Sequence, residues 1–403
     1  MLRKIVSDTR NVSIIHYWHG NFIIYNKFLL MFKRKFSYSF LFASSLFVLS
    51  GCGGNSGSQI KNPADNSSAA DTSMAATVLP KPDWGSDIRP EMLEVINKLS
   101  SYGALPLESL SATEARKQPT PTTAVMALLK EKNITIPASQ VDTMSRLIPV
   151  TGGAVAARIY TPKSGNGPFP VIVYYHGGGW VIADLNTYDA SARGLAEQVG
   201  AIVVSVHYRQ GPEHLFPTAH QDAFAAYQWT LKNAASLKGD PAKIAVVGES
   251  AGGNLAANVS IQARDKKTML PLYQALIYPV ANNDMNSESY IKYAQAKPLN
   301  KPMMGWFVKN YLGDTLKSSD PRISLVKANL KGLPPTTIIA AEIDPLLTEG
   351  KLLAERLQEA GIAVNYKRYD GVTHEFFGMA LFVPEAKDAQ GVVAADLKKA
   401  FHL

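Results

Sequence analysis

Short apolar runs alternate with helical patterns from about residue 154 to the end of the chain. Runs such as Val171-Ile172-Val173 carry no polar face, which is typical of strands that helices cover on both sides. This alternation predicts an α/β fold with a doubly wound, mostly parallel sheet. The predicted strands are Ala154–Tyr160, Val171–Tyr175, Ala201–Tyr208, Ile244–Gly248, Leu272–Val280, Thr336–Glu342 and Val364–Tyr369. Helical patterns precede them at Pro90–Leu99 and Thr122–Lys132.

A Gly-Glu-Ser-Ala-Gly segment, residues 248–252, lies between a predicted strand and a helical stretch, Asn254–Ala263. A strand, a tight turn and a helix in this order form a nucleophile elbow, in which the turn holds the serine in a strained backbone conformation. Small residues at Gly248 and Gly252 let the strand and the helix approach closely below the serine. We therefore predict that Ser250 is the nucleophile of an acyl-transfer reaction.

A His-Gly-Gly-Gly-Trp segment, residues 176–180, follows an early predicted strand about seventy residues before Ser250. Consecutive glycines leave bare backbone amides that can point at an oxyanion, which is what stabilising a tetrahedral intermediate requires. The natural partner donor is the amide of Ala251, directly after the serine. Taken alone, the segment could also be a turn that needs positive φ angles. Its pairing with the elbow favours the oxyanion interpretation.

A serine nucleophile needs a base, and the base needs an acid that orients it. Among eight histidines, only His374 follows a late predicted strand, where the order serine, acid, histidine places the base. The others lie early in the chain, in the glycine segment, inside a strand or at the end: His16, His19, His176, His207, His214, His220 and His402.

Two acidic residues compete for the role of the orienting acid. Asp344 directly follows the predicted strand Thr336–Glu342 and precedes Pro345, which directs the chain out of the sheet. Asp344 thus lies at the carboxyl end of a strand, where α/β sites form. Glu342 is inside the strand and is expected to point to another face. An Asp before Pro is often only a helix N-cap, so the prediction of Asp344 depends on Ser250 and His374.

The N-terminal part of the chain has the anatomy of an export signal. A basic Lys-Arg-Lys segment, residues 33–35, precedes sixteen uncharged, mostly apolar residues, 36–51, and then Cys52. Sixteen residues rise about 24 Å as a helix, less than the roughly 30 Å hydrocarbon core, which favours a cleaved signal over a permanent anchor. Residues 1–51 also carry six of the eight net positive charges. Residues 52–403 carry the remaining net charge of +2 and contain no basic stripe, which argues against nucleic-acid binding.

The Leu-Ser-Gly-Cys ending of this signal resembles the lipobox of bacterial lipoproteins. The resemblance implies a signal peptide at residues 31–51, lipidation of Cys52 and anchoring of the protein in the bacterial cell envelope. Met31 begins a complete signal, so residues 1–30 are predicted to be an upstream extension. By the same resemblance, a glycine rather than an aspartate directly after the cysteine, here Gly53, favours the outer membrane if the source has two membranes. Residues 52–83 are rich in Gly, Asn, Ser and Ala and predict a flexible tether.

Residues 84–403 resemble the hormone-sensitive lipase-like family of α/β hydrolases, a group of bacterial esterases. The resemblance rests on the two glycine-containing motifs and on further blocks at residues 208–217 and 344–350. It implies an α/β-hydrolase fold of about eight strands with a helical cap, formed by the helices before about Val141 and an insertion at about 283–312. It also implies a small-molecule ester substrate, a preference for short acyl chains, and neither metal nor organic cofactor.

The resemblance also implies a set of site residues. It assigns a triad of Ser250, Asp344 and His374, oxyanion amides of Gly178, Gly179 and Ala251, and supporting roles for His176 and Gly177. Three places depart from the family's commonest pattern, namely Gln210-Gly211, Glu249 and Glu375-Phe376. None removes a catalytic group, but the last puts specificity in doubt.

Two alternative functions stay open at the level of the sequence. The same triad could serve an amidase or a deacetylase of polysaccharides or xenobiotics. A binding protein of the cell envelope, built on a hydrolase scaffold without activity, is an alternative of a different class. The sequence argues against that second alternative, because every group that the mechanism needs is present.

Overall fold

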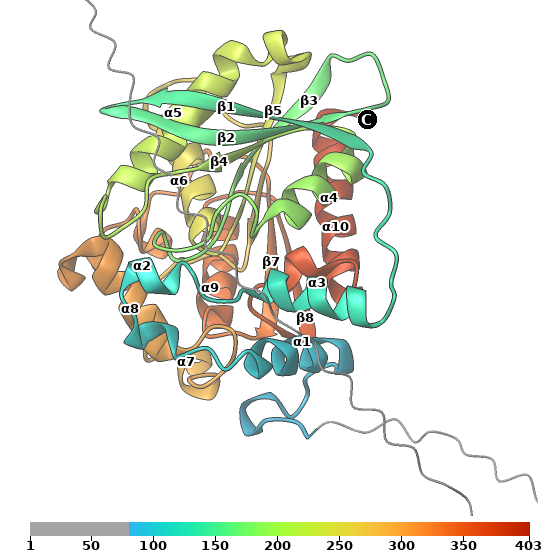
Figure 1. Cartoon of the computed structure of the whole chain (residues 1–403). Coiled ribbons are helices and arrows are strands. Elements are labelled where there is room, and N and C mark those ends of the chain that lie inside the picture. The colour runs from blue at the N-terminus through green and yellow to red at the C-terminus, as the bar shows by residue number, and fades with distance from the viewer. Residues whose placement is uncertain (1–79) are drawn as a thin grey trace, which may run out of the picture. The chain divides into compact units, whose positions relative to one another are not determined.

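The computed structural model describes residues 80–403, and its centre is one sheet of eight strands (Figure 1). The strand order is β1-β2-β4-β3-β5-β6-β7-β8. The pairs β1–β2 and β2–β4 are antiparallel, and all other neighbours are parallel. The strands are β1 (Val141–Val150), β2 (Gly153–Pro162), β3 (Phe169–Tyr175), β4 (Ile202–His207), β5 (Gly239–Glu249), β6 (Gln274–Ile277), β7 (Thr336–Ile343) and β8 (Val364–Thr373). This sheet confirms the predicted α/β-hydrolase fold.

Helices cover both faces of the sheet, which explains why its central strands have no polar face. In β3, Val171 and Val173 pack in one apolar core with residues of α5, α6 and α9. The residues between and after them, Ile172 and Tyr174, pack in a second core with α4 and α10. The covering helices are α4 (Asp189–Val199), α5 (Thr218–Asn233), α6 (Ala251–Asp265), α9 (Leu347–Glu359) and α10 (Pro384–Phe401).

The remaining helices gather at one end of the molecule, the lower part of Figure 1. We call them the cap helices: α1 (Pro90–Ser101), α2 (Ala112–Ala115), α3 (Pro121–Glu131), α7 (Glu288–Lys292) and α8 (Lys301–Leu312). The indole N–H of Trp306 in α8 donates to the carbonyl of Leu110 at 3.0 Å, which joins the two cap segments. At the start of α1, the N–H of Arg89 donates to the carbonyl of Gly371 in β8 at 2.8 Å.

Short 3₁₀ helices complete the described structure. They lie at Asp83–Gly85, Leu107–Ser109, Ala235–Leu237, Thr315–Ser319, Leu325–Lys327 and Phe376–Met379. The predicted extension 1–30, the signal peptide 31–51, Cys52 and most of the tether 52–83 lie outside the described residues.

Two strands differ from the sequence-based prediction. Strand β1 does not appear among the seven predicted ranges, because it is an edge strand whose residues are mostly exposed and form no apolar run. It forms a hairpin with β2 across Gly152, whose φ is +80°. Strand β6 is shorter than the predicted Leu272–Val280. Its extended backbone ends before Tyr278, which has a φ of +36°.

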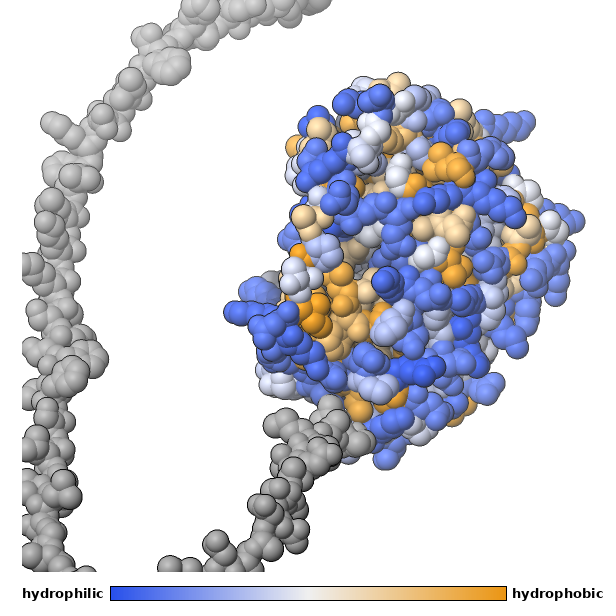
Figure 2. Space-filling view, turned by 90° about the vertical axis from the view of Figure 1, so that its right-hand side faces the viewer, coloured by the Kyte–Doolittle hydropathy of each residue, from blue (hydrophilic) through white to orange (hydrophobic). Residues whose placement is uncertain are grey.

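The face shown in Figure 2 is mainly hydrophilic, with apolar residues gathered toward its left side. Within residues 80–403, no helix is both long and apolar enough to cross a membrane.

Candidate active site

Ser250 occupies the turn between β5 and α6, with φ of 56° and ψ of −119°. This conformation is strained for any residue other than glycine, as expected of a nucleophile elbow. A Cβ atom at Gly248 would lie 2.0 Å from the carbonyl oxygen of Gly252, and one at Gly252 would lie 2.0 Å from that of Tyr175. Both positions therefore require glycine, because any side chain would push α6 away from the sheet.

His374 and Asp344 follow the adjacent strands β8 and β7, and both are buried. The Nδ1 atom of His374 lies 2.6 Å from Oδ2 of Asp344. The other oxygen, Oδ1, accepts a hydrogen bond of 2.9 Å from the N–H of Leu346. The competing acid, Glu342, instead accepts a hydrogen bond of 2.8 Å from the N–H of Gly371. The structure therefore pairs His374 with Asp344 and not with Glu342.

The surroundings of His374 raise its pKa above the ordinary value. Burial alone would lower that pKa, since it disfavours the imidazolium. The negative charge and the hydrogen bond of Asp344 outweigh burial, and the nearby carboxyl groups of Glu375 and Glu249 act in the same direction. The site thus stabilises the positive charge that a histidine acquires when it accepts a proton.

Ser250 and His374 line one cavity of about 360 Å³ together with Gly178 and Gly179. The hydrogen bonds of the described residues do not include one between Ser250 and His374; catalytic contacts of this kind often tighten only when substrate binds. The cap helices and the segments beside them supply the opposite wall, which is mainly apolar. The wall includes Leu99, Leu107, Ala115, Leu299, Met303, Met304 and Phe307.

The glycine segment after β3 borders this cavity with positive φ angles of 93° at Gly178 and 58° at Gly179. A Cβ atom at Gly179 would lie 2.2 Å from the ring of Phe307. Within residues 80–403, the N–H groups of Gly178 and Gly179 donate to no protein acceptor. Ala251 is the first residue of α6, so its N–H has no partner inside that helix. These three amides are available to a ligand.

His176 and Gly177 are the first two residues of this segment, and both are closely packed. The ring of His176 is buried and stacks on Tyr208 at 4.5 Å, and its Nδ1 lies 2.8 Å from the carbonyl oxygen of Gly177. Burial lowers the pKa of His176 to about 3, so its ring is neutral. A Cβ atom at Gly177 would lie 2.2 Å from the hydroxyl oxygen of Tyr188, so glycine is required there as well.

Two of the departures from the family pattern have clear structural partners. The buried carboxyl group of Glu249 accepts hydrogen bonds from the hydroxyls of Tyr174 and Tyr278, and burial raises its pKa to about 7. The side-chain amide of Gln210 donates to the carbonyl oxygens of Ile182 at 2.7 Å and Ala183 at 3.0 Å. Gln210 thereby fixes Ile182 and Ala183, which follow Gly178 and Gly179 closely in the chain.

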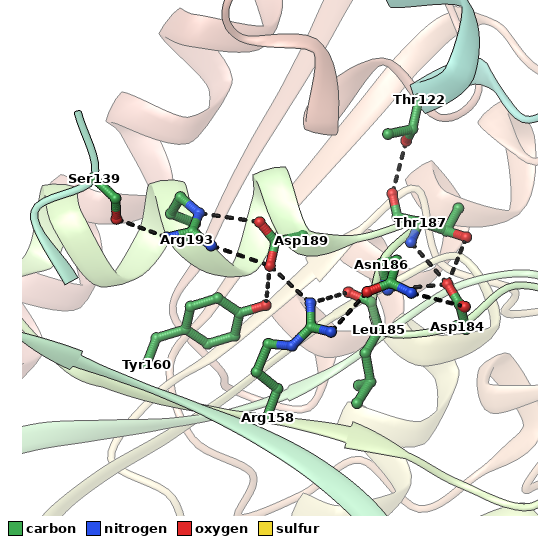
Figure 3. Close-up of polar contacts among 10 residues, drawn as sticks. All are labelled: Thr122, Ser139, Arg158, Tyr160, Asp184, Leu185, Asn186, Thr187, Asp189 and Arg193. Atoms are coloured by element: carbon green, nitrogen blue, oxygen red, sulfur yellow. Dashed lines mark hydrogen bonds and ion pairs between the residues drawn. The ribbon is translucent and has the colours of Figure 1, made fainter. Parts of the chain in front are cut away.

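The loop at residues 184–187 also borders the cavity and is held from several sides (Figure 3). The Asp184 carboxylate accepts hydrogen bonds of 2.9 Å from the N–H groups of Asn186 and Thr187. From β2, Arg158 donates to the side chain of Asn186 at 2.7 Å. From α3, the hydroxyl of Thr122 donates to the carbonyl of Thr187 at 2.7 Å.

Arg116, at the end of α2, connects the cap to the glycine segment at residues 176–180, which we call the oxyanion segment, and to the chain directly after it. It donates to the carbonyl oxygens of Val181 at 2.8 Å and Gly211 at 2.6 Å. It also forms an ion pair with Glu213, which lowers the pKa of that carboxyl to about 2. The sequence analysis does not identify Arg116, because its partners are about 65 to 97 residues away and leave no local motif.

Comparison with known proteins supports the fold and indicates a class of activity. A family model described as alpha/beta hydrolase fold matches residues 172–378. A carboxylesterase of Mycobacterium tuberculosis, NlhH, is 39% identical over 252 residues, which are 62% of this chain and 79% of that protein. An ethyl acetate hydrolase of Pseudomonas putida is 32% identical over 314 residues, which are 76% of this chain and 96% of that protein.

A solved structure of similar architecture is a hyperthermophilic esterase from the archaeon Pyrobaculum calidifontis. It has a TM-score of 0.71 and 35% sequence identity, and the match covers 78% of this chain and 98% of that chain. The present chain belongs to the alpha/beta hydrolase fold family. Because the similar proteins of named activity are carboxylesterases and other ester hydrolases, the chain is a carboxylesterase-type hydrolase.

Proposed function

We propose that this protein is a serine carboxylic ester hydrolase of the hormone-sensitive lipase-like group, which cleaves short-chain acyl esters through an acyl-enzyme on Ser250. One observation carries the proposal. A serine on a strained elbow and a histidine paired with a buried aspartate line the same cavity. This is the constellation of nucleophile, base and orienting acid that acyl transfer needs.

In the first half of the reaction, the Ser250 hydroxyl oxygen attacks the ester carbonyl carbon while Nε2 of His374 takes its proton. The carbonyl oxygen becomes negatively charged and accepts hydrogen bonds from the amides of Gly178, Gly179 and Ala251. The intermediate then collapses, and the bond to the alcohol oxygen breaks. His374 gives its proton to that oxygen, so the alcohol leaves and the acyl group stays on Ser250.

In the second half, water replaces the alcohol. His374 takes a proton from the water, whose oxygen attacks the acyl carbon, and the proton then returns to the oxygen of Ser250 as the acid leaves. Asp344 accepts the hydrogen bond from Nδ1 of His374, which leaves Nε2 free to exchange the proton.

The size of the cavity supports a preference for short acyl chains. Its volume of about 360 Å³ is near the lower end of the roughly 300–1,000 Å³ typical of small-molecule sites. Its wall includes large side chains such as Met304 and Phe307, which limit how far an acyl chain can extend. A long-chain triglyceride needs more room than this cavity offers.

Profiling of substrates tests this proposal. Among p-nitrophenyl esters, we expect kcat/KM to be highest for chains of about two to six carbons and to fall at least tenfold for chains of twelve or more, because longer chains do not fit the cavity. Acetylated sugars and acyl anilides are measured beside them. A higher kcat/KM for anilides or for acetylated polysaccharide would instead assign the site to an amidase or a deacetylase.

We also propose that the mature protein is anchored in a bacterial cell envelope through lipid on Cys52, in the outer membrane if the source has two membranes. The support is the sequence alone, namely the basic segment, the apolar run and the only cysteine of the chain directly after it. Several acyl chains on one residue would hold the enzyme stably, since a single chain binds a bilayer with K of only about 10⁴ M⁻¹.

Metabolic labelling with a fatty acid tests the anchor. We expect the label on the wild-type protein, and we expect Cys52→Ser to lose the label completely because no other thiol is present. The mature mass should correspond to a start at Cys52 plus lipid. An unlipidated product that begins at a different residue would contradict the anchor and leave the hydrolase function intact.

A further inference from the structure

Glu375 is an unusual residue for its position, directly after His374. It has a φ of 69°, in the left-handed region that favours glycine. A residue with a side chain persists in such a conformation only where its surroundings hold it. The Glu375 side chain is 20% exposed and lines the cavity that contains Ser250 and His374.

The carboxyl group of Glu375 is held by Tyr188. The phenolic hydroxyl of Tyr188 donates to Oε1 of Glu375 at 2.5 Å. The same hydroxyl lies against the oxyanion segment, where a Cβ atom at Gly177 would be 2.2 Å from it. Tyr188 therefore fills the space between the oxyanion segment and the residues that follow β8, His374 and Glu375. It also fixes the direction of the Glu375 carboxyl group.

The other oxygen of Glu375, Oε2, has no donor among the described residues. Oε1 lies 3.9 Å from Nε2 of His374, the atom that delivers a proton to the leaving alcohol in the proposed mechanism. Because Glu375 lines the cavity beside Nε2 of His374, its free oxygen is an acceptor close to the place that the proposed mechanism gives to the leaving alcohol. Burial raises the pKa of Glu375, and the nearby His374 and the hydrogen bond from Tyr188 offset only part of that rise.

We propose that Glu375 is a specificity-determining residue that accepts a hydrogen bond from a hydroxyl group of the leaving alcohol. The substrates would be short-chain esters of polyols, such as glycerol or sugar alcohols. This inference rests on the proposed function, because it needs His374 as the acid that faces the alcohol. A cationic alcohol fits less well, since a fixed positive charge beside Glu375 would oppose the imidazolium that forms on His374.

A matched pair of substrates tests the proposal. 1-Butyrylglycerol and propyl butyrate share the acyl group and a three-carbon alcohol, and they differ only in two hydroxyls. We expect the wild-type ratio of their kcat/KM values to fall about tenfold or more in both Glu375→Gly and Glu375→Ala, the usual effect of losing a hydrogen bond to a charged group. Glycine relieves the backbone strain and alanine keeps it, so agreement between the two assigns the effect to the carboxyl group.

Several results would overturn the proposal. An unchanged ratio in both variants, or an equal loss for both esters, would show that Glu375 acts on structure alone. Butyrylcholine, a cationic ester with the same acyl group, is measured as a third substrate. A fall of kcat/KM confined to butyrylcholine in the Glu375 variants would show that Glu375 binds a cation instead. As a control, Glu355→Ala removes an exposed carboxyl group on α9 that does not line this cavity, and it should leave the ratio within about twofold. Failure of a fluorophosphonate to label Ser250 in the wild type would instead refute the proposed function itself.

Discussion

Replacement of Ser250 by alanine is expected to lower the turnover of p-nitrophenyl butyrate by about four to six orders of magnitude. Without the hydroxyl, no covalent acyl-enzyme can form, and only binding and the oxyanion amides remain to accelerate attack by water. The protein should stay folded, because alanine removes a single oxygen atom and leaves the elbow glycines in place. Steady-state kinetics and the thermal unfolding midpoint measure the two effects.

A second buried serine provides the control for this experiment. Ser260 lies on α6, where its hydroxyl bonds to the carbonyl of Ala256 in the same helix. Ser260→Ala should therefore keep wild-type turnover and react with a fluorophosphonate probe, whereas Ser250→Ala should not react. Labelling that persists in folded Ser250→Ala would exclude Ser250 as the nucleophile.

Replacement of Asp344 by asparagine is expected to lower kcat by about 10⁴-fold. A neutral amide no longer stabilises the imidazolium of His374, and it can hold the ring in the wrong tautomer. Glu342→Gln is the matched control, since Glu342 bonds to the N–H of Gly371 and lies away from His374; its kcat should change less than tenfold. Equal losses, or a larger loss in Glu342→Gln, would assign the orienting role to Glu342.

The pH profile adds a second readout for the same pair. His374 must be neutral to accept the proton of Ser250, so kcat/KM rises as the pH passes through the pKa of His374. Asp344 raises this pKa above its ordinary value of 6.5, and the acidic limb of the wild-type profile should therefore have its midpoint above that value. In the residual activity of Asp344→Asn, the limb should move to lower pH. A limb that does not move would mean that another group sets it.

Much of the fold follows from local patterns in the sequence. Residues such as Ile172 and Val173 are apolar on both faces because helices cover both, so the run itself indicates a central strand. The sequence also predicts that the candidate site residues lie near one another, because Ser250 and His374 follow strands whose carboxyl ends meet at one edge of the sheet. The order of serine, aspartate and histidine along the chain completes that prediction.

Other parts of the molecule leave no local signal. The edge strand β1 is stabilised by backbone pairing with β2 rather than by an apolar face, so its sequence resembles that of a loop. The bond between Tyr188 and Glu375 joins residues that are 187 positions apart. The hydrogen bond from Arg158 to Asn186 likewise depends on how β2 and the loop at residues 184–187 lie beside each other (Figure 3). Such contacts exist only once the chain has folded.

The hydrogen bond between Arg89 and Gly371 joins the start of the cap to a strand near the other end of the described chain. Helix α1 is the first α-helix of the described residues, whereas β8 is followed only by the 3₁₀ helix Phe376–Met379 and by α10. Contacts between residues so far apart in the sequence form slowly, because the entropy of closing the intervening chain opposes them. A chain cut before β8 would lack both the partner of Arg89 and His374, so this attachment of the cap and the candidate base would be lost together.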